Sequence, residues 1–438
     1  MTNTGHGWEQ PMEQRAVLTC VLTAQDHGRF VEVPFSVPQG TERISVSCEV
    51  EGYEFAGKVV DLGLRDPVRA RGWSGGARSE FWVEGEKATP GYLPGHIQPG
   101  EWAVIVSSNR LPQAGCRVTL IIECIAERYR WLKGDLHLHS VHSDGVYELD
   151  EVLRLSQAAG LDFIALTDHN TTSQNLAHPR ENSILCIPGM ELTTYRGHAN
   201  LLGLRQPLGD FRVNTRRNLD DRLSDARQQG ARIVMNHPFK ECDTPGCRWE
   251  WGSDVAYDWV EVWNGPWREC NSQAVDWWQA QLAGGRRLVA VGGSDTHRPH
   301  PLLHHGMPTN WVWSRSRSTG AILEAVSEGH VFLNHGAEGP TIDLSCGPYI
   351  MGDEVGVPQP EEIRLIVDAA HDGDLVKLFS DRGLEDEVPV TSVGPNETVS
   401  ITRPVDDRRF YRVEVWRYSP QVEQPLMAAL SNPIYFRP

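Results

Sequence analysis

The feature that most constrains the fold of this chain is the segment Gly134–His169, which predicts a strand, a helix and a second strand. Residues 135–139 read DLHLH, so the leucines share one face of a strand and the histidines share the other. Residues 149–160 have apolar side chains at helical spacing and end in glycine, a common helix stop. The apolar strand 161–166 then delivers Thr-Asp-His at 167–169. Candidate ligands at the ends of both strands are typical of a β/α barrel, which carries its chemistry at the C-terminal ends of its strands.

The same arrangement recurs along the chain, where an apolar strand repeatedly meets a His, Glu or Asp at or near its end. Further strands of this kind are predicted at 184–187, 232–235 and 288–291. Neutral imidazole is the commonest protein ligand of metals, and carboxylates often join it. The candidate metal ligands gathered in this way are His137, His139, Asp144, His169, Glu191, His198, His237, Asp295 and His297.

This ligand set contains histidines and carboxylates but no paired thiolates. Such a set suits Zn, Mn or Fe in a hydrolytic cluster better than it suits a cysteine-ligated structural site. A carboxylate such as Glu191 can bridge two cations, and clustered cations can hold a hydroxide and polarise a substrate oxygen together. We therefore expect divalent metal ions as cofactors.

Four regions differ in their patterns. Residues 1–14 are expected to be a short disordered lead, and residues 15–130 show short strands between Gly- and Pro-rich turns, which predicts an N-terminal β-sandwich. Strands and helices alternate over 131–336, which predicts an α/β domain. Alternating strands return over 337–438 and predict a C-terminal β-domain.

The net charge of −17, without a basic tract, argues against nucleic acid binding over a broad surface. No apolar run is long enough to span a bilayer, so no membrane association is expected. The first residues lack a basic and then apolar signal segment, and the nine scattered cysteines suit reduced thiols. We therefore expect a cytoplasmic protein that acts on a small molecule, with oligomerisation through the β-domains as an open option.

Taken in order, the motifs resemble those of the PHP (polymerase and histidinol phosphatase) metallohydrolases. The matching motifs are HLHS at 137–140, SDG at 143–145, TDHN at 167–170, GMELT at 189–193, NHP at 236–238 and GSDTH at 293–297. They lie within residues 131–336, nearly half of the chain. The resemblance implies a distorted (β/α)7, TIM-like barrel with up to three metals. The flanking β-domains look similar to the branch typified by the carbaryl hydrolases CehA and McbA.

The resemblance also implies how the ligands are shared. The first metal would be held by His137, His139, Glu191 and Asp295, the second by Glu191, His198 and His237, and the third by Asp144, His169 and His297. A metal-bridging hydroxide would be the nucleophile, with Asp295 and His237 as catalytic residues and Asp295 as the acceptor of its proton. Asp144 stands where some family members have His, which softens the third site, and His142 is the alternative ligand there. His198 is the least fixed ligand, because its spacing from Glu191 varies.

Other polar residues near the ligands are expected to support them. Arg298, Lys240 and Asn264 are the expected substrate contacts. For Asn264 the alternative is a turn role, because an Asn-Gly pair favours turns. Asp135 and Asp168 flank ligands, and we expect each to orient an imidazole N–H rather than to bind metal.

The leading functional hypothesis is a metal-dependent phosphoesterase that hydrolyses a small phosphomonoester or phosphodiester, because adjacent cations match the charge of a phosphoryl transition state. The alternative is a carbamate, ester or amide hydrolase of the CehA type. A phosphoesterase should place Arg or Lys beside the metals, whereas a carbamate hydrolase should have a drier, aromatic pocket. The chain offers both Arg298 and 15 tryptophans, so the sequence leaves this choice open. A non-catalytic binding module is a third hypothesis, and the complete set of competent ligands argues against it.

Overall fold

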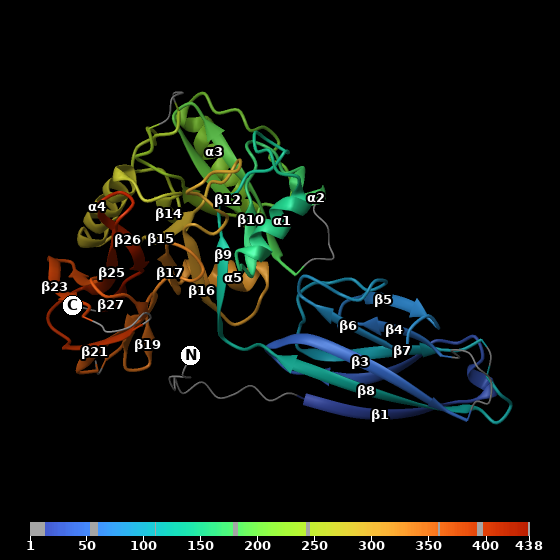
Figure 1. Ribbon diagram of the computed structural model, residues 1–438. Coiled ribbons are helices and arrows are strands. Elements are labelled where there is room, and N and C mark those ends of the chain that lie inside the picture. Colours follow the sequence, from blue (N-terminus) through green and yellow to red (C-terminus); the bar gives the residue numbers. More distant parts are fainter. Residues whose placement is uncertain are drawn as a thin grey trace. The chain divides into compact units, whose positions relative to one another are not determined.

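The computed structural model describes residues 14–52, 60–109, 111–177, 183–241, 246–357, 360–391 and 397–436. The chain divides into two compact units, Met1–Tyr129 and Arg130–Pro438 (Figure 1). Residues 1–13, which make up most of the expected disordered lead, lie outside the described residues. Gln14, the next residue, already belongs to the first strand.

The first unit consists of two four-stranded antiparallel sheets with the orders β1–β8–β3–β6 and β2–β7–β4–β5. In β2, Val33, Phe35 and Val37 are buried while the residues between them are exposed, as the two-residue period of a strand requires. Both sheets turn their apolar faces toward one hydrophobic core, which is the packing of a sandwich. The elements are β1 (Gln14–Leu22), η1 (Ala24–Asp26), β2 (Val31–Val37), β3 (Thr41–Glu51), β4 (Asp61–Arg65), β5 (Ala70–Gly75), β6 (Glu80–Glu84), β7 (Gly100–Ser107) and β8 (Cys116–Ala126).

The second unit begins with seven strands that are neighbours in chain order, from β9 to β15. Leu138, just after β9, forms a parallel bridge with Thr296, just after β15, so the first and last strands meet and the strands form a closed ring. The elements are β9 (Arg130–Asp135), α1 (Leu149–Ala158), β10 (Phe163–Leu166), α2 (Gln174–Ala177), β11 (Leu185–Thr194), β12 (Gly197–Leu202), α3 (Arg216–Gln228), β13 (Arg232–Met235), β14 (Trp259–Asn264), α4 (Glu269–Ala283) and β15 (Val289–Gly293).

One strand of this ring departs from the (β/α)7 pattern that the family resemblance implies. β12 runs antiparallel to β11 and to β13, whereas the other neighbouring pairs are parallel. β11 ends at Thr194 and β12 begins at Gly197. So short a connection permits only an antiparallel hairpin, because a parallel crossover needs about a dozen residues or more. The protein is therefore a mixed α/β protein in which several antiparallel sheets accompany one mixed sheet.

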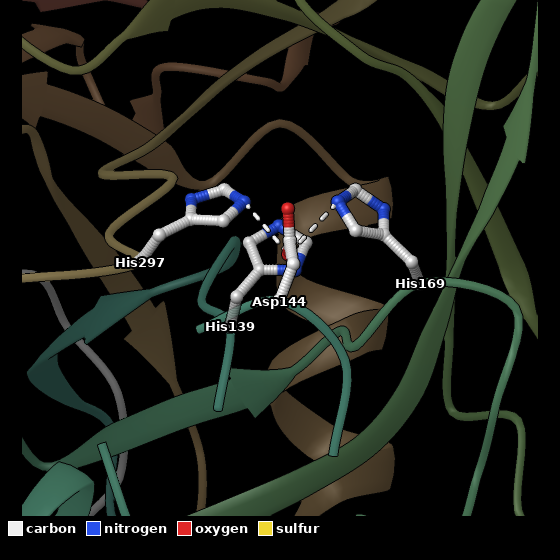
Figure 2. A group of neighbouring side chains, drawn as sticks. All are labelled: His139, Asp144, His169 and His297. Carbon is white, nitrogen blue, oxygen red and sulfur yellow. Dashed lines mark ion pairs between the residues drawn. The ribbon is translucent and has the colours of Figure 1, made fainter. Parts of the chain in front are cut away.

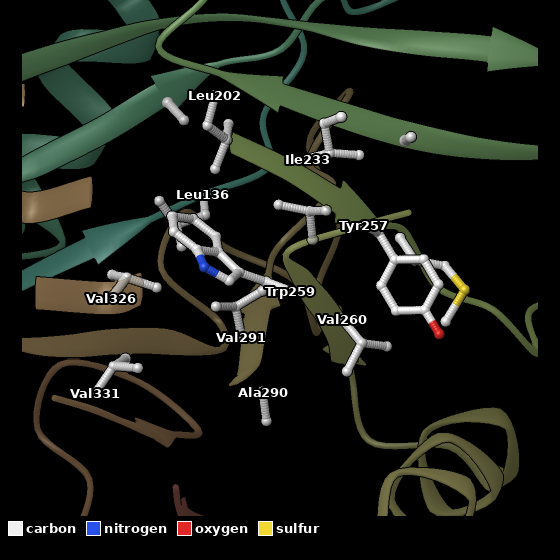
Figure 3. Packing of buried hydrophobic residues seen from close by; sticks show 14 of the residues in the cluster. Leu136, Leu202, Ile233, Tyr257, Trp259, Val260, Ala290, Val291, Val326 and Val331 are labelled. Carbon is white, nitrogen blue, oxygen red and sulfur yellow. The ribbon is translucent and has the colours of Figure 1, made fainter. Parts of the chain in front are cut away.

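Apolar side chains from several strands pack together in the core of the second unit. Trp259 of β14 is 1% exposed and belongs to the same cluster as Leu136, Leu202 and Val291 (Figure 3). Aromatic side chains of this kind bury roughly 150–250 Å² each and dominate the energetics of a core. The loops that follow the strands therefore start from a rigid, close-packed base, which is the support that a functional site needs.

The C-terminal strands extend the same sheet. β16 (Thr309–Ser314) pairs with β9, β17 (Val331–Asn334) pairs with β16, and β26 pairs with β17. Asn432 adds a link, because its Nδ2 donates to the carbonyl oxygens of Ala290 and Val331 at 2.9 Å each. The remaining elements are α5 (Thr319–Ser327), β18 (Thr341–Cys346), β19 (Tyr349–Ile350), β20 (Glu354–Val355), β21 (Glu362–Ala370), β22 (Leu375–Ser380), β23 (Gly383–Pro389), β24 (Glu397–Pro404), β25 (Phe410–Ser419), β26 (Gln424–Ser431) and β27 (Ile434–Phe436).

Two observations bear on the expected environment of the chain. Within the described ranges, no helix has the length and apolar character needed to cross a membrane. Most of the cysteines are free thiols, namely Cys20, Cys48, Cys116, Cys124, Cys186, Cys270 and Cys346. Cys247, however, is disulfide-bonded, so the expectation of reduced thiols is wrong for that residue.

Candidate metal centre

The candidate ligands gather at one edge of the ring of strands. They come from the segments after β9 (His137, His139 and Asp144), after β10 (His169), from β11 (Glu191) and β12 (His198), and from the segments after β13 (His237) and β15 (Asp295 and His297). Parallel strands end at the same edge of a sheet, which brings together residues that follow them. β12 runs the other way, so His198 reaches this edge from near the start of its strand. The ligand atoms fall into four groups whose members lie within 4.8 Å of one another.

The innermost group consists of His137, His139 and Asp295. Nε2 of His137 lies 3.1 Å from Nε2 of His139, and Oδ1 of Asp295 lies 3.4 Å and 3.2 Å from these two nitrogens. Both histidines are 1% exposed. Lone-pair atoms held so close in a buried place repel one another unless a proton or another cation lies between them.

Glu191 lies at the centre of the cluster, is 1% exposed, and faces different histidines with its two oxygens. Its Oε1 lies 3.1 Å from Nδ1 of His198, 3.4 Å from Nε2 of His137 and 3.6 Å from Nε2 of His237. Its Oε2 lies 3.4 Å from Nε2 of His139 and 2.8 Å from Nδ1 of His169. A carboxylate divided in this way has the geometry to bridge two cations.

The grouping differs in one respect from the sets that the family resemblance implies. His198 and His237, expected to share a metal with Glu191, both face its Oε1, and their ring centroids are 5.2 Å apart. The tightest groups, however, place His237 with His137 and His198 with His169, each time together with Glu191. The carboxylate of Glu191 therefore links inner and outer histidines, and His139 does so as well, because it belongs to two of the groups.

The outer group consists of His139, Asp144, His169 and His297 (Figure 2). Oδ1 of Asp144 lies 3.4 Å from Nε2 of His169 and 3.3 Å from Nε2 of His297, and the Asp144 side chain is 59% exposed. The alternative ligand, His142, instead has its Nδ1 2.7 Å from Oγ of Ser173. Of the two candidates, Asp144 is the one that joins the outer group.

The partners of the outward-facing ring nitrogens assign the protons of two histidines. Nδ1 of His297 lies 2.8 Å from the carbonyl oxygen of Asp295, and Nδ1 of His237 lies 3.2 Å from the carbonyl oxygen of Cys247. A carbonyl oxygen only accepts, so both Nδ1 atoms carry the proton. Nε2 of each ring then presents a lone pair to the cluster, as it does in metal-ligating histidines.

Charges inside the cluster shift the pKa values of its members. Burial alone would lower the pKa of His137, but Asp295 and Glu261 raise it well above its usual value. Burial alone would raise the pKa of Asp295, but Lys240 and His137 hold it well below its usual range. For His139, burial prevails and lowers the pKa to about 4. The carboxylates are ionised, and the raised pKa of His137 shows that they favour a positive charge beside them, which a metal ion would also supply.

Two of the ligands have a strained backbone. His237 has a φ of 26° and Asp295 a φ of 54°, a left-handed region that costs non-glycine residues about 1–3 kcal/mol. The backbone N of His237 donates to Oε2 of Glu261 at 2.9 Å, and the backbone N of Asp295 donates to the carbonyl oxygen of His137 at 2.8 Å. These bonds hold the strained conformations, and such strain clusters at functional sites.

Two residues that hold the ligands are absent from the sequence-based set. Glu261 in β14 contacts both His137 and His237, and Asn236 donates from Nδ2 to Oε1 of Glu191 at 2.7 Å. The sequence does contain a signal for Glu261, because this carboxylate lies in the middle of the apolar strand WVEVWN, where a charged side chain needs a partner. For Asn236 the signal is its place between a strand and His237.

Two of the three expected substrate contacts lie beside the ligands. Nζ of Lys240 donates to Oδ2 of Asp295 at 2.6 Å and to Oδ1 of Asn264 at 2.9 Å. Nδ2 of Asn264 lies 3.3 Å from the same Asp295 oxygen. Arg298 is exposed, and in the described part of the chain it forms no hydrogen bond or ion pair with a candidate ligand. The structure brings Lys240 and Asn264 to the cluster but not Arg298.

Asp135 and Asp168 do not have the expected role of orienting an imidazole. Their carboxylates accept hydrogen bonds from backbone N–H groups instead. Asp135 Oδ1 accepts from the backbone N of His137 at 3.2 Å and of Ser294 at 3.0 Å. Asp168 accepts from the backbone N of Ser140 at 2.9 Å and from its Oγ at 2.8 Å. Backbone N–H groups beyond the ends of strands have lost their ladder partners, and these short carboxylates replace them.

The residues of the cluster fit divalent metal ions. Oε2 of Glu191 is buried and has no hydrogen-bond partner of acceptable geometry among the described residues, although Nδ1 of His169 lies 2.8 Å away. A buried carboxylate oxygen without a partner is costly, and a cation removes that cost. Nitrogen and oxygen ligands without a thiolate suit Zn, Mn or Fe. These buried groups can therefore bind metal ions.

No protein-family model matches the chain. Among curated proteins, it is similar to the uncharacterized protein MJ1587 of Methanocaldococcus jannaschii, with 25% identity over 148 residues, 30% of this chain and 82% of that protein. Among solved structures, it is similar to a two-domain protein from Bacteroides vulgatus containing a predicted PHP-like metal-dependent phosphoesterase, with 20% identity, a TM-score of 0.39, and coverage of 69% of this chain and 96% of the other. A second similar structure is an amidohydrolase from Chromobacterium violaceum with bound sulfate and no metal, with 17% identity, a TM-score of 0.29, and coverage of 39% and 90%. At these TM-scores, any assignment of chemistry rests on the ligand geometry of this chain.

Proposed function

We propose that this protein is a metal-dependent phosphoesterase that hydrolyses a small phosphomonoester or phosphodiester. The observation that carries the proposal is a cluster made of four overlapping sets of His, Glu and Asp side chains. The ammonium of Lys240 contacts one of the carboxylates of this cluster. Adjacent cations together with a lysine match the negative charge that a phosphoryl group carries in the transition state.

In this proposal each part of the cluster has a role in holding metal. Glu191, whose two oxygens face different histidines, would help to hold two metals, and Asp144 with His169 and His297 would hold the outermost one. Bound divalent cations supply activation of water and polarisation of the scissile ester. The chain contributes the fixed positions of the ligands and a place to hold a proton.

Asp295 is the proposed proton acceptor. Its Oδ1 lies among the inner imidazole nitrogens, while its Oδ2 accepts from Nζ of Lys240 and faces Nδ2 of Asn264. Burial raises its pKa, but Lys240 and His137 hold that pKa well below the usual range, so the carboxylate carries no proton of its own at neutral pH. His237 is the second proposed catalytic residue, with Nε2 turned toward Glu191 at 3.6 Å.

Lys240 favours a phosphoester over the carbamate alternative. Its side chain is 27% exposed, and its ammonium lies against Oδ2 of Asp295, beside the candidate ligands. A phosphoryl oxygen accepts a charge-assisted hydrogen bond from an ammonium, whereas a neutral carbamate gains less from it. Three tryptophans of the second unit, Trp259, Trp263 and Trp278, pack in its hydrophobic core and are at most 2% exposed, so these three do not line an open aromatic pocket.

The test is a side-by-side rate measurement of manganese-loaded protein on bis(p-nitrophenyl) phosphate and on an aryl N-methylcarbamate. We expect turnover of the phosphate and its loss in the Asp295→Ala variant. Turnover of the carbamate alone would overturn the proposal in favour of a carbamate hydrolase. Silence on both substrates and on a panel of small phosphomonoesters, with metal bound, would favour a non-catalytic binding module.

A further inference from the structure

Glu261 is a buried carboxylate in an otherwise apolar strand. It lies in β14, whose residues are all buried, and it is 2% exposed. A charge in such a place costs several kcal/mol unless it is paired or fully hydrogen-bonded. The partners of Glu261 therefore indicate why the chain tolerates a carboxylate there.

Both oxygens of Glu261 contact candidate metal ligands. Oε1 lies 2.9 Å from Nδ1 of His137, and Oε2 accepts from the backbone N of His237 at 2.9 Å. One carboxylate thus contacts the side chain of one ligand and the strained backbone of another. Nδ2 of Asn264 donates to Oε2 at 3.1 Å and completes the set.

From these contacts we infer that Glu261 is a positioning residue that sets the proton position of His137 and the backbone conformation of His237. The inference rests on the proposed function, because it assumes that the two histidines bind metal. With a carboxylate against Nδ1, the imidazole of His137 keeps its proton on Nδ1 and its lone pair on Nε2, the atom that faces His139 and Asp295. The bond to the His237 backbone helps to hold the φ of 26°.

The surroundings preserve this contact. A methyl group at Gly293 would stand 2.3 Å from Cβ of His137 and 2.5 Å from Oε1 of Glu261, so only glycine leaves room for the pair. Asn264 also lies between two carboxylates, because its Nδ2 faces Oε2 of Glu261 and Oδ2 of Asp295, while its Oδ1 accepts from Lys240. The ammonium of Lys240 therefore offsets the negative charge that Glu261 adds beside the candidate ligands.

Glu261→Gln tests the inference, because glutamine has the same shape and only one acceptor oxygen. That oxygen cannot accept from Nδ1 of His137 and from the backbone N of His237 together. The backbone N–H cannot change, so the amide NH2 faces His137, whose proton moves to Nε2 and removes the lone pair from the cluster. We expect the affinity for zinc to fall by about 10- to 100-fold, measured by competition with a chromophoric chelator.

Glu414→Gln is the matched control. Glu414 is 4% exposed and accepts from Nη1 of Arg412 and from Nε1 of Trp416, at 2.7 Å each. Its substitution removes a buried charge of the same kind, and in the described part of the chain neither partner is a candidate ligand. We expect the affinity of this variant for zinc to equal that of the wild type.

The outcomes separate this inference from the proposed function. A folded Glu261→Gln variant with wild-type zinc affinity would overturn the inference and leave the proposed function intact. A wild-type protein that binds neither zinc nor manganese would overturn the proposed function itself. If the variant does not fold, ¹⁵N NMR of the zinc-loaded wild type decides: we expect the proton of His137 on Nδ1, and a proton on its Nε2 would overturn the inference.

Discussion

Glu191 and Asp144 carry the same charge in opposite surroundings. Glu191 is 1% exposed among histidines, whereas the side chain of Asp144 is 59% exposed. Water can solvate Asp144 when no cation is present, but Glu191 depends on its neighbours. The inner positions therefore need a cation more than the outer one does.

This difference predicts unequal losses of metal. Glu191→Ala should reduce metal content at two positions, because its two oxygens face different histidines. His297→Ala should affect mainly the outer position, where it meets Asp144. The measurement is elemental analysis of both variants after loading with manganese. Equal losses in the two variants would contradict a bridging role for Glu191.

Lys240→Met should lower kcat/KM on bis(p-nitrophenyl) phosphate by on the order of tenfold or more, since a hydrogen bond to a charged group contributes about 1.5–3 kcal/mol. Metal content should change little, because the ammonium contacts Oδ2 of Asp295, and Oδ1 is the oxygen that faces the histidines. Lys240→Arg, which keeps the charge, is the control and should retain more activity. An unchanged kcat/KM in Lys240→Met would exclude it as a phosphate contact.

At this scale the sequence singles out candidate ligands that the structure brings together, but it does not reveal the residues that support them. Ligands follow apolar strands, so a local pattern finds them. Glu261 lies 124 positions from His137, and no local pattern joins two residues so far apart. Lys240 and Arg298 carry the same signal, a cation close to a ligand, yet only Lys240 reaches the cluster. Arg298 follows His297 directly but lies in a bend, and its side chain is exposed.

Among the elements, strand β13 has the predicted bounds 232–235, and helix α1 begins at the predicted residue 149, because apolar periodicity is a local signal, as is the glycine after α1. The antiparallel direction of β12 depends instead on the length of the connection before it. The direction of a strand therefore depends on the loop before it, and the alternation of residues within the strand does not reveal it. The family resemblance implies a distorted (β/α)7 barrel but does not reveal this hairpin.

Ser156 of α1 contacts His305, a buried titratable residue that the proposed chemistry does not use. Oγ of Ser156 donates to the carbonyl oxygen of Val152 at 2.8 Å, so Nδ1 of His305, 2.9 Å from the same Oγ, is a donor. His305 is 5% exposed, and burial lowers its pKa from 6.5 to about 4. Its imidazole therefore stays neutral in the folded protein at a pH at which the unfolded chain binds a proton.

This pKa predicts a loss of stability in acid. The contribution of His305 is constant above its unfolded pKa of 6.5 and declines as pH falls toward the folded pKa of about 4, by about 3 kcal/mol in total. His305→Gln removes this dependence, so the difference in free energy of unfolding between wild type and variant should shrink as pH falls. Urea unfolding of both proteins at about pH 7 and about pH 4.5 measures it. A difference that is independent of pH would contradict the assignment.

For the whole molecule, the sequence predicts an all-β start, an α/β middle and an all-β end, and strands occur in each of these regions. It does not predict that strands after residue 337 extend the sheet of the α/β region, through β26 against β17. Asn432 and Ala290, which bond to each other, are 142 positions apart. Pairing over such separations depends on complementary surfaces rather than on any local pattern.

The measurement that tests the account most directly is anomalous X-ray diffraction from crystals of the manganese-loaded protein. The account predicts anomalous peaks within the cluster, one against Oε1 and another against Oε2 of Glu191, with imidazole nitrogens around each. Density in which protonated histidines pair with Glu191 and Asp295, and manganese peaks lie elsewhere or are missing, would contradict it.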